Sequence, residues 1–283
     1  MKRLQSFVIS GKHFNSEHTF TCGQFFRYKK EGDSFFVNSL DKYAKISKQG
    51  NDFLVETFDT KYFKEFLALE DDYEQKKMEL SAFDFLKNPI EFGHGIRILH
   101  QNLFEAIICF IVSQNNNIKR IKKIIESLCE KCGTKIQSPL GEFFAFPTRE
   151  QLQKLSYEEL CELGLGYRAR YIKDVLPLLS DEFLGKLKVS TTIEARQLLV
   201  ALPGIGRKVA DCILLFGLGR DEVFPVDVWC ERIYFSYFSA HAKSNTQIAK
   251  SREKISNYLS EVFGENAGLA QQYLFFFERS HKS

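Results

Sequence analysis

The stretch that decides the fold reads Leu202-Pro-Gly-Ile-Gly-Arg-Lys208 and continues through Val209-Ala-Asp-Cys212 to Pro225-Val-Asp227. Apolar residues at helical spacing predict one helix before this turn, over 193–201, and a second after it, over 208–218. Pro203 fixes one backbone angle of the connection, and the two glycines supply a positive φ or room for a close neighbour. Such a short turn presents backbone N–H groups at a helix N-terminus, where a phosphate binds. The stretch therefore predicts a helix-hairpin-helix, over about 193–218, that holds a DNA backbone.

Two side chains in this stretch suggest chemistry. Lys208 lies in the first turn of the second predicted helix, where the macrodipole and partial burial would both lower its pKa. A lysine that loses its proton near pH 7 can form a Schiff base with a sugar carbon. Asp227 begins another predicted helix, so its carboxylate should stay ionised and stabilise positive charge on a deoxyribose. Each residue alone is better explained as a phosphate contact, for Lys208, or an N-cap, for Asp227, and only the pair favours catalysis.

The composition of the 283 residues excludes several classes of protein. Apolar residues make up 44% and aromatic residues 14%, which indicates a globular chain with a substantial core. The net charge of +3 is too small to indicate DNA binding by itself, so that inference depends on local clusters. Seven cysteines form no secreted framework, no second pair faces Cys129 and Cys132, and no four-cysteine iron–sulfur pattern is present. Without an apolar leader or membrane-spanning run, we expect a reduced, intracellular protein.

The pattern of residues 1–93 differs from that of the rest of the chain. Short aromatic-rich runs between Gly-Asp and Gly-Asn turns predict antiparallel strands, over 20–28, 34–38, 43–46 and 53–58. Helices are predicted afterwards, over 59–67, 73–86, 102–114, 118–132, 149–155, 157–163, 168–179 and 181–187. We therefore predict an α+β fold with an N-terminal antiparallel β-sheet domain (1–93) and a mainly α-helical body (94–283) that contains the helix-hairpin-helix.

The last predicted helix, over 267–278, offers a partner for the helix that carries the lysine. Gln271 and Phe275 are four residues apart and share a face, as do Lys208 and Cys212. We expect the two faces to meet across a slot. Phe275 and Cys212 would then sandwich a flat ring, Gln271 would bind its edge, and Lys208 would reach the attached sugar.

Three further segments have an ordinary explanation beside a functional one. Residues 22–28 can be a strand with a glycine bulge, residues 115–117 a helix cap and turn, and residues 163–171 a packed corner. Alternatively, an asparagine in such a turn can fill the gap left by a base that has left the stack. An aromatic residue followed by arginines suits insertion into kinked DNA. Basic side chains lie beside the asparagines, at Lys119, Arg120, Lys122 and Lys123.

The run LPGIGRKVADCILLFGLGRDEVFPVDVW resembles the helix-hairpin-helix–Gly/Pro–Asp signature of base-excision glycosylases, and in detail that of the 8-oxoguanine DNA glycosylases. The resemblance covers nearly the whole chain, the sheet domain included. It implies a bifunctional glycosylase/AP lyase of base excision repair that flips 8-oxoguanine out of duplex DNA. Lys208 would attack C1′ of the sugar while Asp227 stabilises an oxocarbenium-like transition state, and β-elimination at the 3′ phosphate would follow.

The resemblance also implies roles for residues outside that run. In GQFFRY, the carbonyl of Gly23 would accept a hydrogen bond from N7–H of the oxidised base, which undamaged guanine lacks. In SQNNNIKRI, Asn115 would fill the gap in the stack and Arg120 would contact the opposite cytosine. In GLGYRARY, Tyr167 would wedge between bases and Arg168 would reach the same cytosine.

The remaining expectations concern the DNA backbone, cofactors and partners. Gly204, Gly206 and Arg207 should contact phosphate, whereas Trp229 replaces a histidine that touches a phosphate in eukaryotic members. No metal or cofactor is required, although relatives hold a monovalent cation on hairpin carbonyls. We expect a monomer that binds duplex DNA containing 8-oxoguanine and no membrane, in the cytoplasm of a prokaryote and associated with the nucleoid.

Two alternatives to this function stay open at the level of the sequence. One is an alkylpurine-type monofunctional glycosylase that activates water, which Lys208 argues against because that branch lacks a hairpin lysine. The other is a non-catalytic helix-hairpin-helix DNA-binding protein, which would need neither Lys208 nor Asp227.

Overall fold

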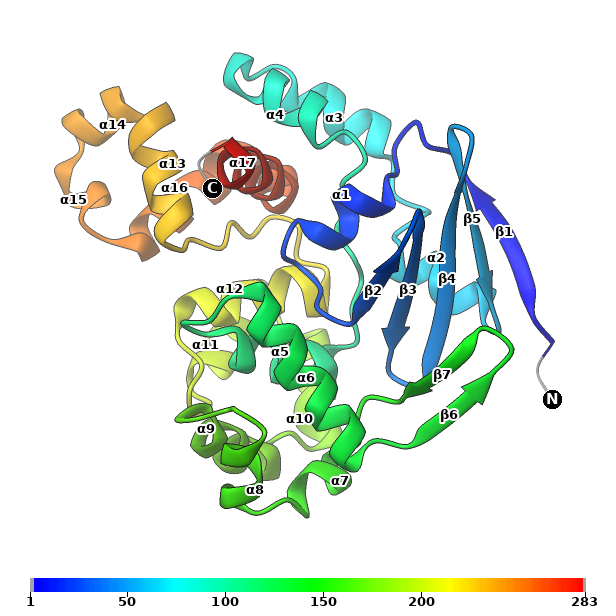
Figure 1. The fold of residues 1–283 in the computed structure, drawn as a ribbon. Coiled ribbons are helices and arrows are strands. Elements are labelled where there is room, and N and C mark those ends of the chain that lie inside the picture. Colours follow the sequence, from blue (N-terminus) through cyan, green and yellow to red (C-terminus); the bar gives the residue numbers. More distant parts are fainter. Residues whose placement is uncertain (1–2, 282–283) are drawn as a thin grey trace.

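The computed structural model describes residues 3–281, which form an antiparallel sheet and a larger helical body beside it (Figure 1). The sheet has the strand order β1-β5-β4-β3-β2, and every neighbouring pair is antiparallel. Side chains alternate between buried and half-buried along β3 and β5, so one face of the sheet carries its core. The five strands are β1 Gln5–Ile9, β2 Tyr28–Glu31, β3 Ser34–Ser39, β4 Lys42–Gln49 and β5 Asp52–Thr57.

The strand predicted over 20–28 is wrong for most of its length. Ser16–Thr21 form helix α1 instead, because the side chain of Asn15 accepts a hydrogen bond from the backbone N–H of His18 and caps it. A turn follows in which Gly23 has φ of +96°, and strand β2 begins only at Tyr28. Gly23 therefore lies in a loop between helix and strand, outside the sheet.

The helical body accounts for most of the chain after the sheet. The helix predicted over 73–86 ends at Leu80, as α3 (Tyr73–Leu80), and a short 3₁₀ turn follows at Asp84–Leu86. The helix predicted over 168–179 ends at Val175, and a second 3₁₀ turn that contains Pro177 follows it. Within residues 3–281 no helix is both long and apolar enough to cross a membrane. The helices after α1 are α2 Thr60–Phe66, α3 Tyr73–Leu80, α4 Lys87–Phe92, α5 Leu103–Ser113, α6 Ile118–Cys132, α7 Arg149–Gln153, α8 Tyr157–Glu162, α9 Arg168–Val175, α10 Asp181–Val189, α11 Thr192–Val200, α12 Arg207–Leu218, α13 Val228–Tyr237, α14 Ser239–Ser244, α15 Thr246–Ala249, α16 Arg252–Phe263 and α17 Ala267–His281.

Two hydrophobic cores divide the molecule. The smaller core lies on the sheet, where Phe20 of α1 stacks on Phe35 at 5.6 Å and Phe63 of α2 is fully buried. The larger core fills the helical body and includes Tyr73 and Leu80, so α3 packs with the helices although it precedes residue 93. Figure 1 shows α4 beside α17, with α3 between α4 and the sheet in this view. The boundary near residue 93 stays a prediction.

A second, two-stranded sheet that the sequence did not predict joins the two parts. Its strands are β6 Lys135–Ser138 and β7 Gly141–Phe144, a hairpin that extends from the helical body toward the large sheet (Figure 1). There the ring of Phe143 stacks on Tyr43 of β4 at 4.7 Å. The buried guanidinium of Arg27 also donates to the carbonyl of Phe144 at 2.6 Å. These contacts fix the loop after α1 relative to the helices.

Candidate active site

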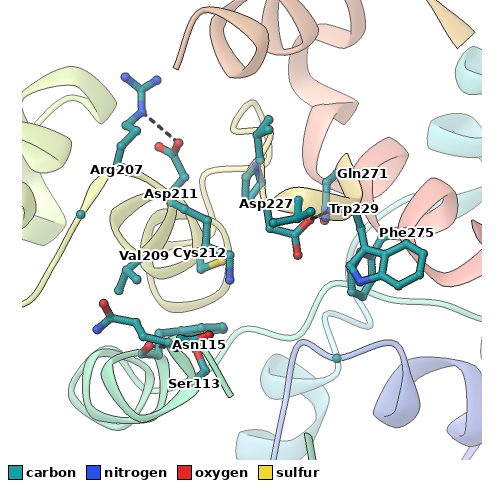
Figure 2. A pocket seen from close by; sticks show the side chains of 18 of the residues that line it. Ser113, Asn115, Arg207, Val209, Asp211, Cys212, Asp227, Trp229, Gln271 and Phe275 are labelled. Carbon is teal, nitrogen blue, oxygen red and sulfur yellow. Dashed lines mark hydrogen bonds and ion pairs between the residues drawn. The ribbon is translucent and has the colours of Figure 1, made fainter. Parts of the chain in front are cut away.

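An open cavity of about 880 Å³ lies among α5, α12, α13 and α17. All residues predicted to bind or react with the nucleotide line it: Gly23, Lys208, Cys212, Asp227, Gln271 and Phe275. Of the residues predicted to contact DNA, Asn115, Tyr167, Gly206 and Arg207 also line it, whereas Arg120, Arg168 and Gly204 lie outside the lining. The structure therefore brings together side chains that are up to about 250 residues apart in the chain (Figure 2).

The hairpin between α11 and α12 has two glycines with different physical roles. Gly204 has φ of +76°, and a Cβ there would lie 2.3 Å from Cγ of Tyr171, so the turn packs directly on the ring of α9. Gly206 is the N-cap of α12, has no neighbour within 4 Å of a Cβ position, and provides no side-chain cap. The N–H groups of the first turn of α12 are consequently open to an acceptor from outside the protein.

Lys208 lies in the first turn of α12 and is half-buried in the cavity wall. Burial by itself would lower its pKa, but Cys212, which hydrogen-bonds to the lysine, and the carboxylate of Asp227 outweigh it, so the pKa is raised. Burial also raises the pKa of the Cys212 thiol. The expectation of a depressed lysine pKa is therefore wrong, because the interactions with Cys212 and Asp227 together outweigh burial.

Asp227 is the N-cap of α13. Its Oδ1 accepts hydrogen bonds from the backbone N–H groups of Trp229 and Cys230, each at 2.9 Å, so the carboxylate is fixed by the backbone. Figure 2 shows it directed into the space between Cys212 and Phe275. The capping explanation and the catalytic one are thus compatible, since the cap uses Oδ1 and leaves Oδ2 out of those two bonds.

The two side chains predicted to stack on opposite faces of a flat ring lie on α12 and α17. Figure 2 shows Cys212 on one side of the cavity and Phe275 on the other. Gly23 approaches Phe275 closely, since a Cβ on the glycine would lie 3.4 Å from Cε1 of that ring. A side chain at this position would touch the Phe275 ring, and the φ of +96° by itself favours glycine.

Gln271 is held in one orientation by its neighbours. It is 5% exposed, its Nε2 donates to the sulfur of Cys230 at 3.2 Å, and its Oε1 accepts from Gln272 Nε2 at 2.6 Å. An amide fixed in this way presents a defined pattern of donor and acceptor to a ring in the slot.

The asparagine turn after α5 is held by hydrogen bonds from a buried arginine side chain. Asn115 is exposed and has φ of +45°, a conformation that asparagine tolerates better than most residues. Arg168 is only 3% exposed and donates to the carbonyls of Gln114, at 2.8 Å, and Asn115, at 2.9 Å. The guanidinium predicted to reach a cytosine holds the backbone of the turn, and its contact with a cytosine stays a prediction. Tyr167 beside it is 49% exposed, and exposed Arg120 donates to the carbonyl of Gly164 at 3.3 Å.

Arg207 does not extend toward solvent as a phosphate contact would. Its guanidinium donates to Asp211 at 2.9 Å, to Glu253 at 3.0 Å and to Asn257 at 2.6 Å. Asp211 is fully buried and also pairs with Arg196 at 2.7 Å. The aspartate of the VADC run therefore connects α11, α12 and α16, a structural role that sequence reasoning missed.

Sequence reasoning also missed Arg279, which lines the cavity. It follows Gln271 and Phe275 at intervals of four residues on α17, so the same helical spacing that linked those two could have found it. Trp229 lines the cavity as well, and the Cζ atom of Arg232 lies 5.2 Å from the centre of its ring. Within residues 3–281 no group of His, Cys, Asp and Glu side chains is arranged to hold a metal ion.

A hairpin lysine and a capping aspartate that converge on a cavity of this size define a class of DNA repair protein. The chain belongs to the HhH-GPD superfamily of base excision DNA repair proteins, whose family model matches residues 108–258. Residues 6–107 match the model of the 8-oxoguanine DNA glycosylase N-terminal domain. The two matches together span the sheet and most of the helical body.

Individual relatives agree with this assignment. The chain is 31% identical over 280 residues to the N-glycosylase/DNA lyase OGG1 of Arabidopsis thaliana, a match that covers 92% of this chain and 76% of the relative. It is 32% identical to the N-glycosylase/DNA lyase of Saccharomyces cerevisiae, with 84% and 70% covered. It is also similar to the Clostridium acetobutylicum 8-oxoguanine glycosylase/lyase bound to double-stranded DNA with cytosine opposite 8-oxoguanine. That structure superimposes with a TM-score of 0.90 at 31% identity and complete coverage of both chains.

Proposed function

We propose that this protein is a bifunctional N-glycosylase/DNA lyase that excises 8-oxoguanine from duplex DNA in base excision repair. The observation that carries the proposal is the convergence of Lys208 and Asp227 on a cavity walled by Cys212 and Phe275. The names of the relatives and their near-complete coverage support the same activity.

The protein binds DNA along the face that contains the cavity mouth. The open N-terminus of α12 at Gly206 takes a backbone phosphate, and the exposed ring of Tyr167 enters the stack where the duplex is kinked. Asn115 fills the gap that the flipped nucleotide leaves. Arg120 is exposed in the first turn of α6, directly after the asparagine turn, and contacts the opposite base, while Arg168 holds the backbone of the turn.

The flipped base is held between Cys212 and Phe275, with its edge against the amide of Gln271. The Gly23 carbonyl accepts the N7–H that distinguishes 8-oxoguanine from guanine. An undamaged guanine places a lone pair at this position, so two acceptors would face each other without water. Discrimination thus depends on one backbone carbonyl, in a residue whose φ of +96° favours glycine.

The raised pKa of Lys208 gives the lysine two successive tasks. As the C1′–N9 bond breaks, the base leaves with the bonding electron pair, and the Lys208 ammonium supplies the proton that neutralises it. The amine so formed attacks C1′, whose developing positive charge is stabilised by Asp227. Loss of the second proton and ring opening give a Schiff base. Removal of a C2′ proton then expels the 3′ phosphate by β-elimination.

Borohydride trapping tests this function directly. Incubation with duplex DNA containing 8-oxoguanine opposite cytosine, in the presence of sodium borohydride, should give a covalent protein–DNA adduct. Lys208→Gln should give none, whereas Lys186→Gln on α10, outside the cavity, should behave as the unaltered protein. DNA binding without any adduct from the unaltered protein would favour the non-catalytic alternative, and release of methylated purines in place of 8-oxoguanine would favour the alkylpurine one.

We further infer that the protein acts as a monomer on chromosomal DNA in the cytoplasm and needs no cofactor for the reaction. A monovalent cation on the carbonyls of the hairpin would stabilise the turn rather than take part in the chemistry. Light scattering of the protein with and without duplex DNA tests the stoichiometry, and thermal unfolding in potassium and in a bulky organic cation tests the ion.

A further inference from the structure

Arg279 is the third residue in a row of side chains that α17 directs at the cavity. Gln271, Phe275 and Arg279 succeed one another at intervals of four, and all three line the cavity. The first two have assigned tasks in the proposed function, on the edge and the face of the base. The third lies in the last turns of α17, where a cation is favoured by the helix dipole.

The guanidinium of Arg279 connects the two sides of the slot. Its Nη2 donates to the backbone carbonyl of Thr21 in the loop after α1, and its Cζ lies 5.2 Å from the centre of the Phe275 ring. Its Nη1 is 3.2 Å from the point where a Cβ on Gly23 would lie. One side chain therefore touches the loop that carries the Gly23 carbonyl and the ring that stacks on the base.

The loop and the ring are anchored to different parts of the molecule, and Arg279 contacts both. Gly23 has φ of +96° in a loop that the buried side chain of Gln24 ties to the backbone of Arg97 and Leu99, whereas Phe275 is a half-buried ring on α17. Discrimination of the base requires the carbonyl and the ring to keep a fixed separation, because a hydrogen bond is lost when its partners move apart by a few tenths of an ångström. A planar cation that hydrogen-bonds on one side and stacks on the other can maintain that separation.

We propose that Arg279 is a positioning residue for base recognition, which sets the Gly23 carbonyl and the Phe275 ring relative to each other. This inference rests on the proposed function. It assigns Arg279 to the step in which the base occupies the slot and leaves it out of the later step at an abasic sugar. Lys208 and Asp227 act on the sugar in both steps, so the two activities should separate when the arginine is replaced.

The test uses Arg279→Met, which keeps an unbranched apolar stem, and Arg279→Gln, which keeps a polar end; both are shorter than arginine and remove the cation. Single-turnover base excision from 8-oxoguanine opposite cytosine should fall by about 10- to 100-fold, the range expected when reacting groups shift by about 1 Å. Strand cleavage at a preformed abasic site should stay within about twofold of the unaltered protein, because that substrate has no base to position. Arg149→Leu is the matched control, since Arg149 also donates to a backbone carbonyl, that of Leu179 at 3.1 Å, but lies outside the cavity.

The outcomes separate the inference from the function on which it rests. Excision that falls while abasic cleavage and melting temperature persist supports the positioning role. Excision that is unchanged in both variants overturns it, and so does an equal loss of both activities, which would mean that Arg279 only stabilises the fold. If Arg279→Met does not fold, Arg279→Gln carries the test, since a polar side chain is the milder change at this partly exposed position. Failure of the proposed function itself would appear as an unaltered protein without excision.

Discussion

Alanine substitutions at the two hairpin glycines distinguish the glycine that the packing of the turn requires from the glycine that leaves a helix N-terminus accessible to phosphate. In Gly204→Ala the backbone must keep φ of +76°, which costs an L-residue about 1–2 kcal/mol. The new Cβ would lie 2.3–2.6 Å from three atoms of Tyr171, and relief of such overlap in a packed region costs about 1–3 kcal/mol more. We therefore expect the free energy of unfolding to fall by about 2–5 kcal/mol.

Gly206→Ala is the matched comparison in the same turn. Its φ of −85° suits alanine and no atom lies within 4 Å of the new Cβ, so the free energy of unfolding should change by less than about 1 kcal/mol. The methyl group instead obstructs the open N–H groups of α12, and affinity for duplex DNA should weaken by about tenfold, or 1.4 kcal/mol. Urea unfolding measures the first quantity and fluorescence anisotropy at fixed salt the second.

A double substitution identifies the source of the Gly204→Ala effect. Tyr171→Ala removes the two ring atoms but keeps the Cβ at 2.6 Å and the positive φ, so the coupling energy between the two positions should recover only part of the overlap cost of about 1–3 kcal/mol. A Gly204→Ala protein that unfolds at the same urea concentration as the unaltered one would refute the reasoning, because it would mean that neither the ring nor the backbone angle constrains the turn. So would a Gly206→Ala protein that binds DNA with full affinity, since the helix N-terminus would then take no phosphate.

Three further predictions concern the reaction and its support. Asp227→Asn should slow base release by about two to three decades in single-turnover assays while DNA affinity is retained, and an unchanged rate would discredit its electrostatic role. Because the pKa of Lys208 is raised, the neutral amine becomes about tenfold scarcer for each unit of pH below that pKa, so trapping at a preformed abasic site should accelerate through pH 6–9; a plateau near pH 7 would show that bound DNA depresses the pKa. Asp211→Asn leaves Arg196 and Arg207 without their buried anion, so the free energy of unfolding should fall by about 2 kcal/mol or more, and a smaller loss in urea would mean that the ion pairs are replaceable.

The sequence alone determined the elements whose signals are local. The helix α6 begins and ends where the apolar spacing and the Asn117 cap predict, and α11 and α12 flank the glycine turn as expected. These features depend on side chains within a few residues of one another, so periodicity and capping chemistry suffice to locate them. The same spacing also predicted that Gln271 and Phe275 share a face of α17, and both line the cavity.

Only the tertiary structure decided how the charged groups are paired. The pKa of Lys208 depends on its burial, on Cys212 and on Asp227 from another helix, and the guanidinium of Arg207 donates to Glu253 on α16. Arg168 lies beneath the asparagine turn for the same reason, because carbonyls from a different segment satisfy its donors. Arg279 joins α17 to the loop after α1 across most of the chain length. Each outcome depends on distances between segments far apart in sequence, and charges interact through space, so no local pattern could fix their partners.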